Sequence, residues 1–331
     1  MSIFSNASAG RCQECCSNFF KKRLSFVYCI LLVVIIKQCY CIERIGFNAT
    51  LQSTIINKDP FFDTADPDNL GKMISINDDN NEILIFEEYL NKTERHGYSD
   101  GEAIDSIKNF FWGKRNGIVL EIGALDGLYL SQSKPMVDKL GWHRIIIEGA
   151  PTWLERLKQY SKDALSLHLT VCNHPHFIHY IDKKDEGING ILEYMSPSFI
   201  RDFHKDAYNT TRTEWHTLPS VSRVPCFPLS SVFTEFKIYY INYFILDVEG
   251  AEYDVLQSIN FDLVMFDVIT VETEKQYRNP AFTIKLTTFL RSKGYHRLWC
   301  SGRNSWYVHY SYNISTHPNS DFQLNNCVRD P

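Results

Sequence analysis

Residues 117–127 read GIVLEIGALDG and join an apolar segment to a turn that contains two glycines. The apolar run at residues 118–122 is typical of a strand that is covered on both faces of a parallel sheet. Gly123 and Gly127 allow the backbone to turn tightly and to approach a ligand. Their G-x-x-x-G spacing differs from the G-x-G-x-x-G fingerprint of dinucleotide-binding folds. We therefore expect the first strand of an α/β domain, followed by a ligand-binding turn of another kind.

Strand-like and helix-like stretches alternate around this segment. Buried strands separated by helices predict a doubly wound, mostly parallel sheet of the α/β class. No helix separates the last two strands, so we expect an antiparallel C-terminal hairpin at one edge. Residues 187–224 form an insertion that is long enough to cover an acceptor site. The expected strands are residues 118–122, 144–148, 167–171, 243–247, 264–271, 295–300 and 306–310, and the expected helices are residues 102–113, 152–160, 251–259 and one that ends at residue 289.

Polar residues at the strand ends indicate a ligand site, because ligands in such sheets bind outside the carboxyl ends of the strands. Glu121 is placed to receive a cation or hydroxyl groups, and Glu148 follows at the distance where such folds bind ribose hydroxyls. Ser131 can cap the next helix and leave backbone N–H groups facing a carboxylate. A ribose, a cationic centre and an amino-acid carboxylate together describe S-adenosylmethionine. The candidate cofactor-binding residues are Glu121, Gly123, Asp126, Gly127, Ser131, Glu148 and Asp247.

The string FILDVEGAE at residues 244–252 brings acids to the end of a later strand. Glu249 and Glu252 fit the first turn of a helix, where negative charge is favourable. Glu249 and Glu252 already supply this charge, so a helix cap alone would not require Asp247. Glu272 ends the following strand and should lie at the same edge of the sheet. Asp247, Glu249 and Glu272 are therefore the candidate catalytic bases for a hydroxyl acceptor. A divalent metal at these carboxylates is the alternative, but base catalysis is favoured and no metal site is assigned.

These strings resemble the FkbM-type methyltransferases, a branch of the class I S-adenosylmethionine-dependent enzymes. The resemblance covers roughly residues 117–310 and rests on GIVLEIGALDG, GWHRIIIEGAP, ITVE and, most specifically, YFILDVEGAEYDVL. It implies a Rossmann-like class I methyltransferase fold. It also implies that Glu121, Gly123 and Gly127 shape the methionine pocket, that Glu148 holds the ribose, and that Asp247 lies between cofactor and acceptor.

The N-terminal region predicts contact with a membrane. Residues 24–36 are uncharged and apolar, follow Lys21-Lys22-Arg23, and reach about 28 Å as a helix if they continue to residue 42. We expect a cytosolic tail at 1–23, an uncleaved signal anchor at 24–42, a lumenal stem with short ordered pieces at 43–100, the methyltransferase-like domain at 101–315 and a tail at 316–331. The alternative is a signal peptide that is cleaved near Cys39-Tyr40-Cys41, which would release a secreted protein.

A lumenal or extracellular body agrees with two further features. The body contains four glycosylation sequons, and its cysteines are even in number. A disulfide between Cys172 and Cys226 is expected, whereas His174, His176 and His179 should not converge on a metal, since 179 points to the opposite face of a strand. The sequons begin at Asn48, Asn91, Asn209 and Asn313.

Charge and composition limit the function. The chain has 34 basic and 39 acidic residues with 44% hydrophobic residues, so it can build a substantial core. Beyond residue 41 there are 29 basic and 38 acidic residues, and such an acidic body excludes nucleic acid as the expected partner.

We expect a type II membrane protein of the ER, the Golgi or the cell surface that methylates a hydroxyl of a glycan or small secreted acceptor. The layout is also similar to the insect Star proteins, which act in the export of membrane cargo. That likeness gives the alternative, a non-catalytic lumenal protein that binds protein cargo.

Overall fold

The structure is a computed structural model that describes residues 50–64, 72–75, 100–183, 186–273, 280–317 and 320. The described residues from Leu51 onward form one compact unit. The predicted cytosolic tail and signal anchor lie outside the described residues. Among those that are described, no helix is both long enough and apolar enough to cross a membrane.

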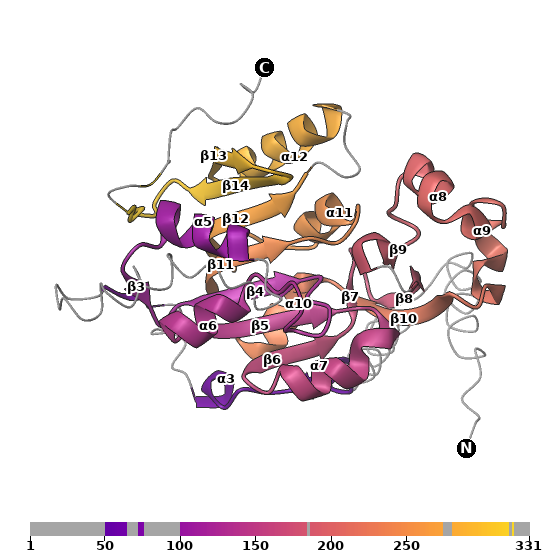
Figure 1. Ribbon diagram of the computed structural model, residues 1–331, viewed down its shortest axis with the longest axis horizontal. Helices are drawn as coiled ribbons and strands as arrows, with labels where there is room; N and C mark the ends of the chain where they lie inside the picture. The colour runs from indigo at the N-terminus through magenta and orange to yellow at the C-terminus, as the bar shows by residue number, and fades with distance from the viewer. Residues whose placement is uncertain are drawn as a thin grey trace, which may run out of the picture. The chain divides into compact units, whose positions relative to one another are not determined.

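The largest sheet in the described part of the chain has the strand order β1-β6-β5-β4-β11-β12-β14-β13 (Figure 1). The neighbours from β6 to β12 are parallel, β14 runs antiparallel to β12, and β13 pairs antiparallel with β14. The predicted α/β class and the antiparallel hairpin at the sheet edge are therefore confirmed. The strands are β1 (Ile55–Asn57), β4 (Ile118–Ile122), β5 (His143–Glu148), β6 (Ala164–His168), β11 (Tyr240–Leu246), β12 (Met265–Glu272), β13 (Tyr295–Ser301) and β14 (Asn304–His309).

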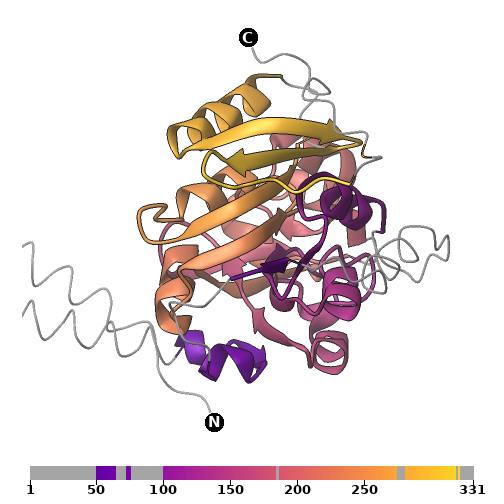
Figure 2. The same ribbon diagram turned by 90° about the vertical axis from the view of Figure 1, so that its left-hand side faces the viewer.

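Helices cover both faces of this sheet. In Figure 2, the purple and magenta helices α5, α6 and α7 lie on one side, and the orange and yellow helices α10, α11 and α12 lie on the other. The first face buries a cluster in which Phe110 of α5 and Met136 of α6 pack with Val119 and Tyr243 of the sheet. The helices are α5 (Asp100–Phe110), α6 (Lys134–Leu140), α7 (Leu154–Tyr160), α10 (Leu229–Phe236), α11 (Glu252–Gln257) and α12 (Pro280–Ser292).

The strand that was expected at residues 167–171 is two strands. β6 begins earlier, at Ala164, and stays beside β5, whereas β7 (Thr170–Val171) leaves the main sheet and pairs with β10 (Val221–Phe227). The chain changes sheets at Leu169, which is fully buried. From Leu165 to Val171 apolar and polar residues alternate without a break, so the segment reads as one strand although it serves two sheets, which explains the error.

The insertion builds a second, smaller sheet with the order β7-β10-β8-β9, where β8 is His176–Ile181 and β9 is Gly190–Ile191. Its core contains Phe199 of α8 (Pro197–Phe203), Ala207 of α9 (Lys205–Tyr208) and Trp215. The expected disulfide between Cys172 and Cys226 is present and joins the end of β7 to β10. The insertion is therefore a folded subdomain beside the main sheet.

Part of the predicted stem belongs to the folded unit. β1 pairs antiparallel with β6 at the edge of the main sheet. Asp59 Oδ2 lies 2.9 Å from Nδ1 of His143, whose ring also stacks on Phe61 of α3 (Phe61–Thr64). A two-stranded sheet, β2 (Ile74–Ser75) with β3 (Lys114–Arg115), adds a further ordered piece. The rest of the stem lies outside the described residues.

Candidate functional site

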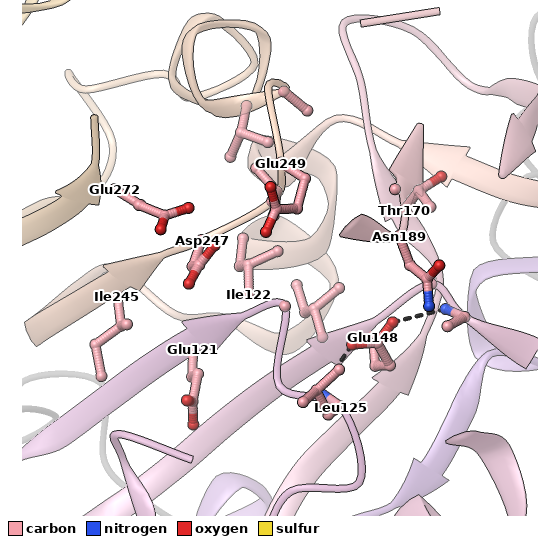
Figure 3. Close-up of a pocket in the computed structure, with 18 of the residues that line it drawn as sticks. Glu121, Ile122, Leu125, Glu148, Thr170, Asn189, Ile245, Asp247, Glu249 and Glu272 are labelled. Atoms are coloured by element: carbon pink, nitrogen blue, oxygen red, sulfur yellow. Dashed lines mark hydrogen bonds between the residues drawn. The ribbon is translucent and has the colours of Figure 1, made fainter. Parts of the chain in front are cut away.

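A cavity of about 240 Å³ lies at the carboxyl ends of β4, β5, β11 and β12. This volume lies just below the range of about 300 to 1,000 Å³ that is typical of small-molecule sites. Figure 3 shows that Glu121, Glu148, Asp247, Glu249 and Glu272 surround it. Gly123 lines the same cavity, as do Gly187, Asn189, Gly190 and Ile191 of the insertion. Most of the predicted site residues therefore meet at one place.

Gly123 brings two of the strand ends into contact. Its φ is +90°, and a Cβ added there would lie 1.9 Å from the carbonyl oxygen of Asp247. The N–H of Asp247 also donates to the carbonyl of Ile122 at 3.2 Å. A residue without a side chain is therefore required where the loop after β4 crosses the loop after β11.

Glu121 organises the chain after the glycine turn. Its buried carboxylate accepts hydrogen bonds from Ser131 Oγ at 2.7 Å, from Ser133 Oγ at 2.5 Å, and from the N–H groups of Gln132 and Ser133 at 2.8 and 3.3 Å. The N–H groups that were expected to face a ligand carboxylate therefore bind the protein's own carboxylate. Ser131 Oγ accepts from the N–H of Lys134 at 3.2 Å, but the N-cap position of α6 is occupied by Ser133, so Ser131 lies two residues before the predicted cap.

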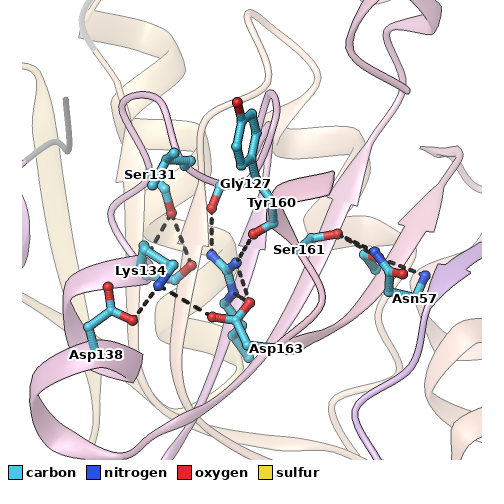
Figure 4. Close-up of polar contacts among 12 residues, drawn as sticks. Asn57, Gly127, Ser131, Lys134, Asp138, Tyr160, Ser161 and Asp163 are labelled. Carbon is cyan, nitrogen blue, oxygen red and sulfur yellow. Dashed lines mark hydrogen bonds and ion pairs between the residues drawn. The ribbon is translucent and has the colours of Figure 1, made fainter. Parts of the chain in front are cut away.

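Asp126 and Gly127 shape the glycine loop and, like Ser131, do not line the cavity. Asp126 Oδ1 accepts from the N–H groups of Leu128 and Tyr129, and Oδ2 pairs with Arg156 at 2.6 Å. The carbonyl of Gly127 accepts from Nη1 of the fully buried Arg144 at 2.7 Å. The same guanidinium also donates to Asp163 and to the carbonyl of Tyr160. Figure 4 shows how Gly127, Tyr160 and Asp163 come together here. These predicted cofactor residues position the loop from outside the cavity.

Glu148 is held at the far side of the cavity by backbone donors. Its Oε2 accepts from the N–H of Leu125 at 2.8 Å, and Oε1 accepts from the N–H of Ala150 at 2.6 Å and from the Tyr180 hydroxyl at 3.3 Å. Burial raises the pKa of the carboxyl to about 7, and these hydrogen bonds only partly oppose that effect. The side chain is therefore poised between its charged and neutral forms near neutral pH.

Asp247, Glu249 and Glu272 form what we call the acidic cluster. One carboxylate oxygen from each lies within 4.8 Å of the others. Glu249 and Glu272 are buried, Asp247 is half-buried, and Glu272 Oε1 pairs with Nη1 of Arg303 at 3.2 Å. Glu252, in contrast, is the first residue of α11 and accepts from the N–H groups of Val248 and Gly250, so it fixes the turn that leads into the helix. The structure thus separates the cluster from this acid.

Three residues that sequence reasoning missed line the cavity with buried polar groups. Gln132 Oε1 and Trp153 Nε1 are buried and have no hydrogen-bond partner among the described residues. Asn304 is 8% exposed and lies beside Glu272. The position of Gln132 next to Ser131 was a weak sequence signal that it belongs to the site. Trp153 closely follows Glu148 in the chain, and nothing in the sequence signalled Asn304.

Backbone strain is also concentrated here. Leu125, Leu130 and Glu249 have φ values of 50°, 55° and 52°, and all three line the cavity. Bulky residues rarely adopt this left-handed conformation, and such strain is found preferentially at functional sites.

The three histidines do not converge, as expected. The ring of His174 stacks on that of His176, whereas His179 Nδ1 bonds to Glu193 at 2.7 Å. The cysteines beside them form the disulfide.

Comparisons with known proteins point to one family. The family model for the methyltransferase FkbM domain matches residues 121–297, a range that holds most of the cavity residues. Among solved structures, the crystal structure of methyltransferase FkbM from Methylobacillus flagellatus KT is similar at 10% identity and a TM-score of 0.37. That likeness covers 69% of this chain and 59%, less than two thirds, of the other. No curated protein matches.

Proposed function

The chain belongs to the FkbM methyltransferase domain family, and on that basis we propose that it is an S-adenosylmethionine-dependent O-methyltransferase of the secretory pathway. Its acceptor in this proposal is a hydroxyl of a glycan or of another small secreted molecule. The observation that carries the proposal is the single cavity that Glu148 shares with Asp247. In this proposal one acid holds the ribose, and the other faces the reacting hydroxyl.

The residues around the cavity fit the cofactor. Glu148 offers about four acceptor positions and uses three of them, so one remains for a ribose hydroxyl. The Trp153 N–H can donate to a ring nitrogen of adenine, and Gln132 Oε1 can accept from the amino group of the methionine part. Each of these two buried atoms has no partner among the described residues, so a ligand would satisfy both.

The residues of this chain supply alignment and proton removal. When bound, S-adenosylmethionine supplies a methyl group on a positively charged sulfur, which becomes a neutral thioether once the acceptor oxygen has taken the methyl group. Glu148 orients one end of the cofactor, and the Gly123 crossing fixes the loop against Asp247. Asp247, Glu249 or Glu272 takes the proton that the acceptor hydroxyl loses.

Location in the secretory pathway is supported by surface and disulfide chemistry. Asn209 and Asn313, which begin two of the four sequons, are exposed, and the asparagines of the other two sequons lie outside the described residues. A disulfide such as Cys172–Cys226 persists in oxidising compartments. A short tail, an anchor and a stem before the domain complete a layout that is typical of Golgi glycan-modifying enzymes.

The proposal is tested by calorimetric titration of the full-length protein, in detergent, with S-adenosylmethionine and with S-adenosylhomocysteine. We expect saturable binding of both. Absence of binding at millimolar concentrations would overturn the enzyme proposal and favour the non-catalytic lumenal protein that binds cargo.

A further inference from the structure

The acidic cluster has the composition and spacing of a cation site. We infer that Asp247, Glu249 and Glu272, together with Asn304, bind one divalent cation that prefers oxygen ligands, with Ca²⁺ as the best match. Two of the three carboxylates are buried. Like charges held this closely in a poorly solvated place repel each other, and a divalent cation removes that cost.

The number of protein ligands favours Ca²⁺ over Mg²⁺. One oxygen from each of the three carboxylates lies within 4.8 Å of the others, so one ion can lie between them. Mg²⁺ keeps several of its water ligands and usually binds one or two carboxylates, whereas Ca²⁺ takes six to eight oxygen ligands in a flexible geometry. Three carboxylates and an amide oxygen therefore suit Ca²⁺ better.

Asn304 provides an independent indication of a ligand at this place. Its Cα is paired with that of Glu272 across β12 and β14, so the two side chains leave the sheet on the same face, about 4.5 to 5.5 Å apart at Cβ. Asn304 is 8% exposed and lines the cavity, yet its side-chain amide makes no hydrogen bond with any described residue. An amide carbonyl is a preferred neutral ligand of Ca²⁺.

The donor set argues against a softer metal. All four groups offer oxygen, whereas zinc sites are built mainly from sulfur and imidazole nitrogen. The group Cys172, His176 and Cys226 lies near enough together for such a metal, but both of its sulfurs are taken by the disulfide. With four ligands from the protein, a cation that takes six to eight keeps positions for water and for the acceptor hydroxyl.

Arg303 provides a substitution that should increase the affinity for the cation, whereas substitutions of the ligands should decrease it. Its guanidinium lies 3.2 Å from Glu272 Oε1, but the side chain is 49% exposed, so solvent weakens the pair. Because a positive charge beside the cluster repels a cation, removing it should tighten cation binding.

The cation site rests on the proposed function and deepens it. A hydroxyl that binds to a divalent cation loses its proton more readily, since the ion stabilises the resulting oxyanion. The proton then passes to a carboxylate of the cluster or to water. The cation would therefore serve the acceptor, not the cofactor.

The test is a calorimetric titration of chelator-treated full-length protein, in detergent, with CaCl₂ and then with MgCl₂. We expect one Ca²⁺ per chain and weaker binding of Mg²⁺. Glu272→Gln should weaken Ca²⁺ binding by about tenfold or more, Asn304→Ala should weaken it less, and Arg303→Gln should tighten it by about fivefold. The matched control, Glu155→Gln, changes an exposed acid on α7 and should have no effect. Thermal melting confirms that each variant is folded.

Absence of saturable Ca²⁺ binding by the parent would overturn the inference, as would equal affinity in Glu272→Gln and Asn304→Ala when both are folded. The result is separable from the proposed function, because the titration needs neither cofactor nor turnover. Cofactor binding and turnover that persist in excess EDTA would sink the cation site alone. Specific Ca²⁺ binding without any cofactor binding would uphold the site and sink the enzyme.

Discussion

Glu148 Oε2 accepts a 2.8 Å hydrogen bond from the backbone N–H of Leu125, so the acid that ends β5 is tied to the glycine loop that follows β4. Leu125 has a φ of 50°, a conformation that is strained for a bulky residue. The Arg144 guanidinium holds the same loop from outside, through the carbonyl of Gly127. The loop and the acid therefore form one preorganised unit.

Gly123→Ala should destabilise the protein more than an ordinary glycine substitution. A Cβ at this position meets the Asp247 carbonyl at 1.9 Å, in addition to the cost of a positive φ. The control is Gly302→Ala, where φ is +53° and nothing lies within 4 Å of the added Cβ. Denaturant unfolding should show a loss of about 1 to 2 kcal/mol for the control and a larger loss for Gly123→Ala. Equal losses would show that the loop crossing tolerates a side chain.

Cofactor affinity should depend on pH through Glu148. Burial raises its pKa to about 7, and ribose hydroxyls donate to the ionised form. The affinity for S-adenosylhomocysteine should therefore increase between about pH 6 and about pH 8. Ionisable groups on the ligand affect the parent and Glu148→Gln in the same way. The difference between the pH profiles of the two proteins therefore reports the ionisation of Glu148 alone. The same pH profile in both would remove Glu148 from the site.

The raised pKa also has a stability consequence. The folded state holds a proton at Glu148 more tightly than the unfolded chain, so this contribution to the free energy of unfolding is complete below pH 4.5. It is lost as the pH rises through about 7. Relative to Glu148→Gln, the parent should lose on the order of 3 kcal/mol across that window, as measured by urea unfolding. A pH-independent difference would contradict the burial of an ionisable carboxyl.

Trp153→Phe should separate ligand binding from stability. The indole N–H has no partner among the described residues, so its removal should leave the free energy of unfolding almost unchanged. The affinity for S-adenosylhomocysteine should fall by about 2- to 12-fold, the value of one hydrogen bond. The control is Trp215→Phe, whose N–H donates to the Ala207 carbonyl at 2.9 Å. That variant should lose stability and keep its affinity, and the reverse outcome would place the cofactor elsewhere.

Asp247→Asn should reduce turnover strongly and change cofactor affinity less. The substitution keeps the shape of the side chain and removes the charge that base or cation chemistry requires. A single-turnover assay together with a binding titration separates the two effects. Normal turnover would move the proton acceptor to Glu249 or Glu272.

The sequence was sufficient for the central strands β4, β5, β11 and β12 and for the edge hairpin, because each of these central strands is a short apolar run beside helices. It also placed Glu148 and Asp247, since an acid directly after a buried strand must lie at the sheet's carboxyl edge. It failed for Ser131, whose neighbouring N–H groups bind Glu121. That contact depends on the path of the loop, which no local pattern encodes.

The switch of sheets at Leu169 and the position of Asn304 were also beyond the sequence. From Leu165 to Val171 apolar and polar residues alternate without a break, and only their partners, β5 and β10, distinguish β6 from β7. Asn304 reaches the cavity because β14 pairs with β12, a contact between segments about thirty residues apart. Such long-range pairing is set by the whole fold and has no local signature.

The most direct test of the central claim is a titration of full-length parent and Glu148→Ala with S-adenosylhomocysteine at about pH 8, where the carboxylate is ionised. The parent should bind, and the variant should bind about 10- to 150-fold more weakly, because hydrogen bonds to a charged group contribute about 1.5 to 3 kcal/mol. No binding by the parent at millimolar ligand, or equal affinity in the two proteins, would contradict a cofactor site at the end of β5.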